Sequence, residues 1–180
     1  MAVREILLYS EHKEALREKS KAVPLVNRRV HQLIKDLKDT LEANSNGIGL
    51  AAPQINIHKR VVIACPGVEV NGEWHAGPVI ALVNPEIVES RGERRDFDGC
   101  LSFPGLFGET TRPHYLRVTG LDEDGKPFDR VYEGFNAVVI HHEIDHLDGV
   151  LFIDRIESIR DLYTIRENER GEMVRVPVTG

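Results

Sequence analysis

Apolar residues at helical spacing predict an N-terminal helix over residues 24–44. The apolar positions in this stretch are Val30, Leu33, Ile34, Leu37 and Leu41. They recur every three or four residues, so they form one face that packs on the rest of the protein. Pro24 suits the first turn, and the asparagines and glycine of residues 44–47 predict the end of the helix. A weaker and more charged helical pattern follows near residues 154–168.

Short runs rich in β-branched residues predict strands in the middle of the chain. These runs are residues 60–65, 78–84, 86–90, 115–121 and 128–134. The strands follow one another, and the helices lie mainly towards the two ends of the sequence. This order indicates an α+β fold and not alternating βαβ units. The length of 180 residues suits one domain, 1–180, with one well-packed core.

Residues 135–147 predict a helix that is apolar on two sides. At about 100° per residue, one side carries Phe135, Val138, Val139, His142 and His146. Ile140, Ile144 and Leu147 lie nearly opposite, so we expect this helix to be buried in the middle of the domain. Two buried histidines need partners for their ring nitrogens. Because residues four apart are neighbours on a helix, both rings can reach one metal ion.

Glu143 follows the first of these histidines, which completes the pattern H-E-x-x-H. A glutamate on this turn can lie near a water that the metal activates without binding the metal itself. The alternative is a helix with two hydrogen-bonded core histidines. The apolar surroundings of His142 and His146 favour the metal site.

The residues alone leave the third metal ligand open. A catalytic site of this type takes three protein ligands. The longer motif H-E-x-x-H-x-x-G-x-x-H is excluded because Phe152 stands at its last position. Downstream carboxylates lie in a charged segment that we expect to be solvated; these are Glu157, Glu167, Glu169 and Glu172. Upstream, Cys100 offers a soft thiolate ligand, although a cysteine in isolation is more commonly a buried core residue.

Residues 47–54, Gly-Ile-Gly-Leu-Ala-Ala-Pro-Gln, form a glycine-rich stretch. A helix precedes it where a dinucleotide-binding motif would need a strand, so that function is excluded. Two interpretations stay open. The stretch is an ordinary tight loop, or it brings backbone close to a ligand, with Gln54 as a neutral hydrogen-bond donor.

Composition narrows the class of protein. A net charge of −6 argues against a nucleic-acid-binding surface. No apolar run approaches the roughly 18 residues that span a bilayer. The first residues lack the apolar core of a signal peptide. We therefore expect a cytoplasmic protein without membrane contacts.

Three motifs in order resemble the signatures of the peptide deformylases: GIGLAAPQ (47–54), DGCLS (98–102) and HEIDH (142–146). The resemblance implies a compact α+β domain with antiparallel sheets around a central H-E-x-x-H helix. It implies hydrolysis of the N-formyl group from the formyl-methionine of nascent polypeptides, with release of formate. It also implies one divalent metal ion, usually Fe2+, for which Zn2+, Ni2+ or Co2+ can substitute.

The resemblance also assigns roles to residues. It implies that the metal ligands are Cys100, His142 and His146. It implies that Glu143 is the general acid/base, and that the Gln54 amide and the Leu101 backbone N–H bind the developing oxyanion. Gly49 would meet the substrate through its backbone. For the methionine side chain we expect a slot formed by Ile48, Leu101, Phe135, Val138 and Val139; packing in the core is the alternative role for these residues.

One position departs from the family pattern: Asp98 stands where glutamate is usual. We expect Asp98 to pair with Arg112 and to hold the loop beside the ligand. Cys65, His141 and Asp145 are interpreted as structural. Two other functions remain alternatives: a zinc metallopeptidase and a non-catalytic metal-binding module. Docking on the ribosome through residues 155–180 is a further hypothesis. The sequence makes no prediction about oligomeric state.

Overall fold

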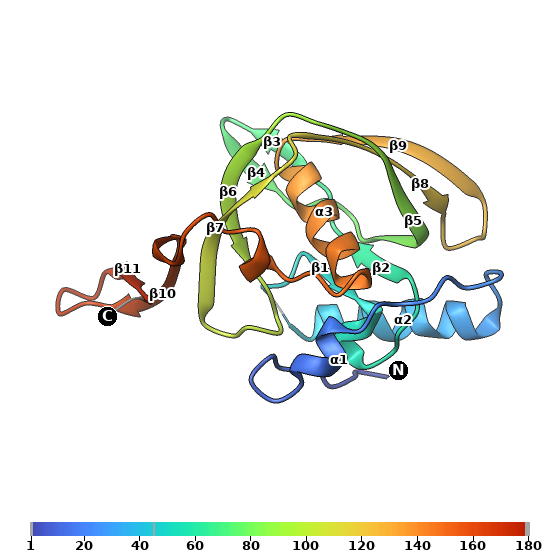
Figure 1. The fold of residues 1–180 in the computed structure, drawn as a ribbon, viewed down its shortest axis with the longest axis horizontal. Coiled ribbons are helices and arrows are strands. Elements are labelled where there is room, and N and C mark those ends of the chain that lie inside the picture. Colours follow the sequence, from blue (N-terminus) through green and yellow to red (C-terminus); the bar gives the residue numbers. More distant parts are fainter. Residues whose placement is uncertain (1, 45, 179–180) are drawn as a thin grey trace.

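In the computed structural model, which describes residues 2–44 and 46–178, helix α3 (Phe135–Leu147) lies between antiparallel sheets (Figure 1). The other helices are α1 (Lys13–Arg17) and α2 (Arg28–Glu42). The strands are β1 (Gly49–Ala51), β2 (Val61–Ala64), β3 (Val68–Val70), β4 (Glu73–His75), β5 (Ile80–Arg91), β6 (Arg94–Gly99), β7 (Leu106–Arg112), β8 (Tyr115–Leu121), β9 (Pro127–Glu133), β10 (Leu162–Glu167) and β11 (Met173–Pro177). This arrangement confirms the predicted α+β class and the antiparallel sheets around a central helix.

The described strands form three sheets. The largest has the order β1-β2-β5-β8-β9, the second has the order β11-β10-β7-β6, and β3 pairs with β4 alone. Every pairing within these sheets is antiparallel. Helix α3 contacts the five-stranded sheet through β1, β2, β8 and β9, and the four-stranded sheet through β7. The helix therefore joins the two larger sheets.

Helix α2 begins at Arg28, four residues after the predicted start at Pro24. Asn27 precedes it in an extended conformation, and its side-chain oxygen accepts a hydrogen bond from the Val30 N–H. This is an N-cap, which satisfies a donor that the first turn of a helix leaves free. The five apolar positions predicted for this helix are all buried, in a cluster that also includes residues of β1 and β2.

Helix α3 has the range predicted from the sequence. Gly134 precedes it with a φ of 64°, a conformation that glycine adopts at little cost. All side chains from Ala137 to Leu147 are buried. Ala137, Ile140 and Ile144 pack into the core under the five-stranded sheet, and the opposite side faces β6 and β7. The two-sided apolar pattern therefore did indicate a central helix.

The predicted strands 78–84 and 86–90 are one long strand, β5. Its pairing with β8 shifts register between Val83 and Glu86, where Asn84 has a φ of 49°. Pro85 lies at this irregularity, which is where a strand tolerates a residue without an N–H. The Asn84 Oδ1 atom accepts a hydrogen bond from the Val23 N–H at 2.9 Å, and the Asn84 Nδ2 atom donates one to the Val23 carbonyl at 2.8 Å.

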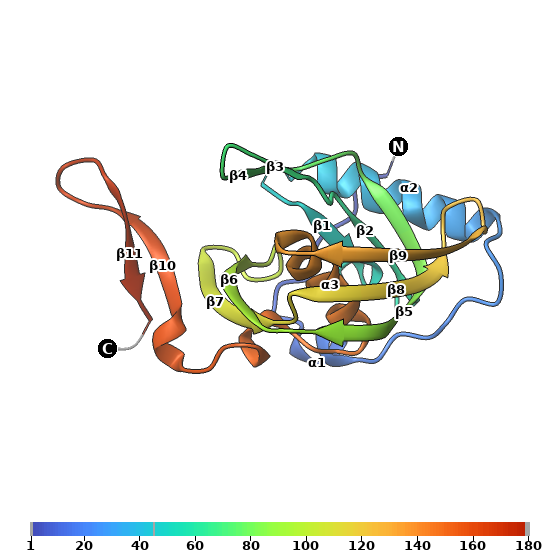
Figure 2. The ribbon, with the colours of Figure 1, turned by 90° about the horizontal axis from the view of Figure 1, so that it is seen from above.

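The helix predicted near residues 154–168 was wrong. Residues Phe152–Asp154 and Ile159–Asp161 form single 3-10 turns, and β10 follows. Leu162 and Tyr163 are buried where β10 pairs with β7, and this burial outweighs the weak helical pattern. Strands β10 and β11 then project from the body of the protein as a hairpin (Figure 2). Among the described residues, no helix is long and apolar enough to cross a membrane.

Candidate metal centre and active site

Helix α3 and the end of β6 bring together three side chains that could bind one metal ion. Cys100 follows the last residue of β6, and His142 and His146 lie one turn apart on α3. The His146 Nε2 atom lies 3.4 Å from Cys100 Sγ and 3.3 Å from His142 Nε2. One donor atom of each residue lies within 4.8 Å of the other two.

These separations fit a metal ion. With metal–sulfur bonds of about 2.3 Å and metal–nitrogen bonds of about 2.0–2.1 Å, tetrahedral ligands lie roughly 3.3–3.6 Å apart. The two measured distances, 3.3 and 3.4 Å, match the edges of such a tetrahedron. One thiolate and two imidazoles form a donor set that suits zinc, iron and similar metals. Three protein ligands would leave a tetrahedral ion one position for water or substrate, as a catalytic site requires.

Asp98 orients the first histidine. Its Oδ1 atom accepts a hydrogen bond from His142 Nδ1 at 2.8 Å, so the His142 Nε2 atom faces His146 and Cys100. Its Oδ2 atom accepts hydrogen bonds from Thr110 Oγ1 at 2.8 Å and Arg112 Nε at 2.9 Å. Burial alone would raise the pKa of the Asp98 carboxyl, but His142 and Arg112 hold it well below its usual range. The predicted pairing of Asp98 with Arg112 is therefore present.

Arg112 connects this carboxylate to His141 and Asp145 on the adjoining side of α3. The guanidinium is 2% exposed, and its Nη1 donates to Asp145 Oδ2 at 2.8 Å and to His141 Nδ1 at 2.7 Å. Burial and the nearby Arg112 charge lower the pKa of His141 to about 4, against the opposing effect of Asp145. Neutral His141 accepts from Arg112. Arg155 binds the same Asp145 carboxylate with two hydrogen bonds. His141 and Asp145 thus lie in an ionic network away from the three ligand atoms.

Glu143 lies beside the ligands on the wall of a cleft. It is 4% exposed, and its Oε1 has no hydrogen-bond partner among the described residues. Burial raises the pKa of Glu143 to about 7, although the nearby His142 acts in the opposite direction. A divalent ion at the three ligands would also oppose this rise. Gly49 packs closely on this side chain, because a Cβ atom built on it would lie 2.5 Å from Glu143 Oε2.

The side-chain amide of Gln54 is fixed in one orientation. Its Oε1 accepts a hydrogen bond from the Ala51 N–H at 3.0 Å. Its Nε2 therefore points towards Ser102 Oγ at 3.1 Å and Cys100 Sγ at 3.4 Å. Gln54 lies in a short 3-10 turn, Ala52–Ile55, directly after β1. The glycine-rich stretch is thus a strand and a turn that bring an amide donor to the sulfur of Cys100.

The cleft beside Glu143 and Gln54 has a volume of about 490 Å³. Almost all of the predicted site residues line it: Ile48, Gly49, Gln54, Cys100, Leu101, Phe135, Val138, Val139, His142 and Glu143. His146 does not line it and is 1% exposed. The carboxylates considered as alternative ligands are exposed, and Cys65 is buried in a core cluster.

Some residues of the site were not predicted. Ser102 accepts a hydrogen bond from the Gln54 amide. Thr110 donates a hydrogen bond to the Asp98 carboxylate. The aromatic residues Phe97, Phe103 and Phe107 line the cleft. No alternation of apolar and polar residues marks this segment, because Phe97 is the one large apolar side chain in residues 94–99.

Comparison with known proteins identifies the family. The profile described as "Polypeptide deformylase" matches residues 3–161. The chain belongs to this family. Its members are metal-dependent enzymes that remove the formyl group from N-terminal formyl-methionine, and the chain is an enzyme of this kind. Family membership disfavours the zinc metallopeptidase and the non-catalytic metal-binding module.

Relatives and solved structures agree with this assignment. A peptide deformylase of Thermomicrobium roseum is 41% identical, covering 94% of each chain. Peptide deformylase 1 of Bacillus subtilis is 40% identical and covers 96% of this chain and 99% of its own. The peptide deformylase from Ehrlichia chaffeensis in complex with actinonin has a TM-score of 0.79 at 31% identity, covering 89% of this chain and 92% of its own. The Met-Ala-Ser-bound class I type b enzyme from Acinetobacter baumannii has a TM-score of 0.78 at 30% identity, covering 86% and 99%.

Proposed function

We propose that this enzyme deformylates nascent polypeptides at the cleft between α3 and β6, with residues 1–180 acting as one domain. The observation that carries the proposal is the convergence of three ligand atoms with Glu143 and Gln54 at one end of the cleft. The pairing of β10 with β7 supports the single domain, because it joins the C-terminal hairpin to the sheet that carries the site.

Cys100, His142 and His146 would hold one divalent metal ion. We propose Fe2+ as this ion, with Zn2+, Ni2+ or Co2+ able to take its place, because the thiolate and imidazole donors suit all four metals. When bound, the ion supplies Lewis-acid chemistry, which polarises the formyl carbonyl and lowers the pKa of a water towards neutrality. Asp98 keeps the proton on His142 Nδ1 and so leaves Nε2 for the ion.

Glu143 would move the protons of the reaction. It would accept a proton from the water that attacks the formyl carbon, and it would return a proton to the peptide nitrogen as the carbon–nitrogen bond breaks. The products are formate and a free amino terminus. The position of Glu143, buried on the wall of the cleft beside the three candidate ligands, supports this role. Burial raises the pKa of its carboxyl, which favours a general acid/base because such a group works best when its pKa is near the working pH.

Gln54 and Leu101 would bind the formyl oxygen as negative charge develops on it. Donors that are already oriented need no rearrangement during the reaction. The Ala51 N–H fixes the Gln54 amide so that Nε2 faces the ligand end of the cleft, which supports this role. For Leu101 the support is its position directly after Cys100, on the wall of the same cleft.

The methionine side chain would occupy the apolar part of the cleft. Phe135, Val138 and Val139 form its helical wall, and Ile48 and Leu101 line it from other elements. Gly49 would meet the substrate backbone. A relative of similar fold binds the peptide Met-Ala-Ser, which is the sequence expected after deformylation of a formyl-Met-Ala-Ser peptide. Docking on the ribosome through residues 155–180 stays a prediction.

The variant Glu143→Gln tests the proposal. We expect the purified variant to retain one metal ion per chain and to release formate from formyl-Met-Ala-Ser about 10²–10⁴-fold more slowly. Glu133→Gln is the matched control, since Glu133 is exposed on β9 and should keep wild-type activity. Unchanged formate release by Glu143→Gln would contradict the proposed role of this residue.

A further inference from the structure

The hairpin of β3 and β4 buries almost none of its own side chains. All three residues of β3 are exposed, and in β4 only Trp74 is partly buried. Two strands that pair only with each other are marginally stable in water. The position of this hairpin therefore depends on the contacts of Trp74 and on the residues at the base of the hairpin.

Two glycines close the base of the hairpin. A Cβ atom at Gly67 would lie 1.7 Å from the carbonyl oxygen of His75, and one at Gly77 would lie 2.3 Å from the carbonyl oxygen of Pro66. The two segments of backbone therefore touch where the hairpin begins and ends. This close contact, which a larger residue would prevent, fixes the direction in which the hairpin leaves the body of the protein.

Asn136, in the first turn of α3, binds both the base of the hairpin and the indole of Trp74. Its Oδ1 atom accepts hydrogen bonds from the Gly67 N–H and from Trp74 Nε1, each at 2.9 Å. Its Nδ2 atom donates to the Gly67 carbonyl, also at 2.9 Å. The hairpin is thus held at the end of α3 where the helix begins (Figure 1).

The indole of Trp74 packs on Phe135, the first residue of α3. The ring centroids are 4.8 Å apart and the planes meet at 70°, which is the edge-to-face geometry that aromatic pairs prefer. Phe135 lines the cleft and Trp74 does not, so the indole lies behind the Phe135 ring as seen from the cleft. Trp74 therefore supports a side chain that forms the cleft wall.

We propose that Trp74 is a positioning residue that sets the size of the methionine slot through Phe135. This inference rests on the proposed function, which puts the methionine side chain against Phe135. Without the indole, the Phe135 ring would have space to move away from the cleft, and the slot would widen. A wall that is held in place discriminates between side chains of different size, because close-packed groups have no room for extra atoms.

Two peptides that differ only in the first side chain measure this discrimination. We expect the wild-type enzyme to have a higher kcat/KM for formyl-Met-Ala-Ser than for formyl-Phe-Ala-Ser. Trp74→Ala should lower the ratio of these two values about three- to tenfold, the range expected for one aromatic contact. For the methionine peptide the change should arise mainly in KM, because the slot contacts the substrate equally in the ground state and the transition state.

Two further variants serve as controls. Trp74→Phe keeps a ring against Phe135 and loses only the indole N–H, so it should restore the wild-type ratio. Val70→Ser changes a side chain that is 50% exposed. Because Trp74 pairs with Glu69, the neighbouring Val70 points to the opposite face of the hairpin, and the ratio should stay at the wild-type value. A purely structural role of Trp74 would lower kcat/KM for both peptides by the same factor in Trp74→Ala and leave their ratio unchanged.

The fluorescence of the wild-type enzyme gives a second test that needs no variant. Trp74 is the only tryptophan in the sequence, so tryptophan emission reports on this wall of the cleft. We expect the product peptide Met-Ala-Ser to change the emission in a saturable way as its side chain fills the slot. Ala-Ala-Ser should leave the emission unchanged.

The outcomes separate this inference from the proposed function. Formate release by the wild type with an unchanged peptide ratio in Trp74→Ala would overturn the role of Trp74 alone. Should Trp74→Ala fail to fold, constant emission at Met-Ala-Ser concentrations that inhibit the wild-type enzyme would do the same. No formate release from formyl-Met-Ala-Ser would overturn the proposed function, and the role of Trp74 with it.

Discussion

Asp98→Ala should weaken metal binding and the fold together. The Asp98 carboxylate is 5% exposed and accepts hydrogen bonds from three buried groups, at 2.8, 2.9 and 2.8 Å. Without it, the His142 ring loses the partner that sets its orientation. Loss of such a partner typically costs about 10–100-fold in metal affinity. We expect the metal affinity of Asp98→Ala to fall below that of the wild type by a factor in this range.

The same change leaves the buried Arg112 guanidinium with fewer partners. Removing one member of a buried ion pair costs about 3–5 kcal/mol. Because Asp145 still binds Arg112, we expect the free energy of unfolding to fall by the lower end of this range, about 3 kcal/mol. For a domain of this size each kcal/mol lowers Tm by about 2–4 °C. The metal-free variant should therefore melt about 6–12 °C below the metal-free wild type.

Two assays measure these effects. Competition with a chromophoric chelator gives the metal dissociation constant, and thermal unfolding of the metal-free proteins gives Tm. Asp96→Ala is the matched control, since Asp96 lies two residues earlier on β6, pairs with Arg94 and does not line the cleft. Wild-type metal affinity and wild-type Tm in Asp98→Ala would refute the reasoning.

Three further predictions concern the same site. Gly49→Ala should displace Glu143, whose Oε2 lies 2.5 Å from the new Cβ position, and should lower kcat about 10²-fold with the metal retained; unchanged kcat would contradict the close packing. Gln54→Ala should lower kcat about 10²–10³-fold at full metal occupancy, measured by formate release; metal loss instead would show a structural role. Cys100→Ser should abolish the rise in Tm that added metal causes in the wild type; a persisting rise would exclude Cys100 as a ligand.

Helix α3 was predictable because its signals agree with one another. The apolar residues lie on both sides of the helix, and glycines stand near both of its ends, at Gly134 and Gly149. The five-residue motif on it already indicated two candidate metal ligands, His142 and His146, with Glu143 beside them. The third candidate ligand was open from the residues alone, because β7, β8 and β9 separate Cys100 from His142 in the sequence and only the fold brings the two residues together.

Strands β6 and β7 were not predicted because their inward positions are polar. Asp98, Thr110 and Arg112 are buried where a typical strand would carry apolar residues, while Phe97 is exposed. A pattern search for apolar residues on one face therefore fails here. The inversion has a physical reason, since the buried face of this hairpin holds the ionic network that orients His142.

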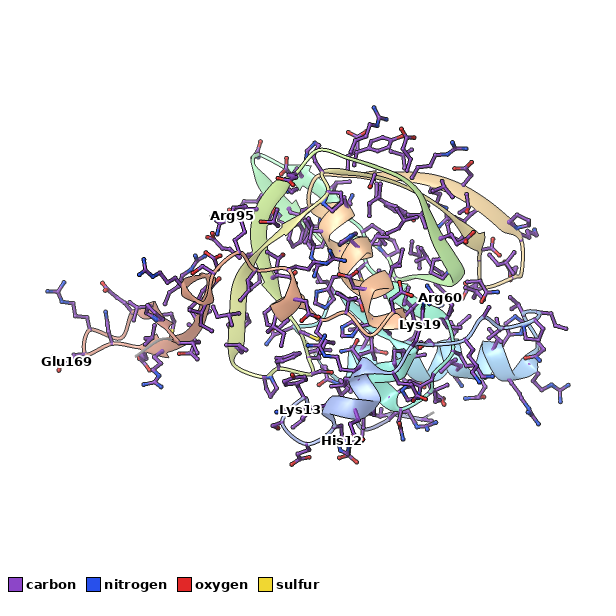
Figure 3. All side chains as sticks on the ribbon, viewed as in Figure 1. His12, Lys13, Lys19, Arg60, Arg95 and Glu169 are labelled. Carbon is purple, nitrogen blue, oxygen red and sulfur yellow. The ribbon has the colours of Figure 1, made fainter. Side chains whose placement is uncertain are left out.

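The C-terminal hairpin was missed for a different reason. Strand β10 pairs with β7 over three residues, and its remaining length pairs only with β11. This tertiary pairing has no local signal in a segment rich in arginine and glutamate. Glu169, labelled in Figure 3, lies at the tip of this hairpin, away from α3.

Formate release from formyl-Met-Ala-Ser tests the central claim most directly. The protein should be purified without oxygen and loaded with Fe2+, and acetyl-Met-Ala-Ser should serve as the control peptide. We predict rapid release of formate from the formyl peptide and no acetate from the acetyl peptide. A protein that binds one metal ion per chain at Cys100, His142 and His146 but releases no formate would contradict the account.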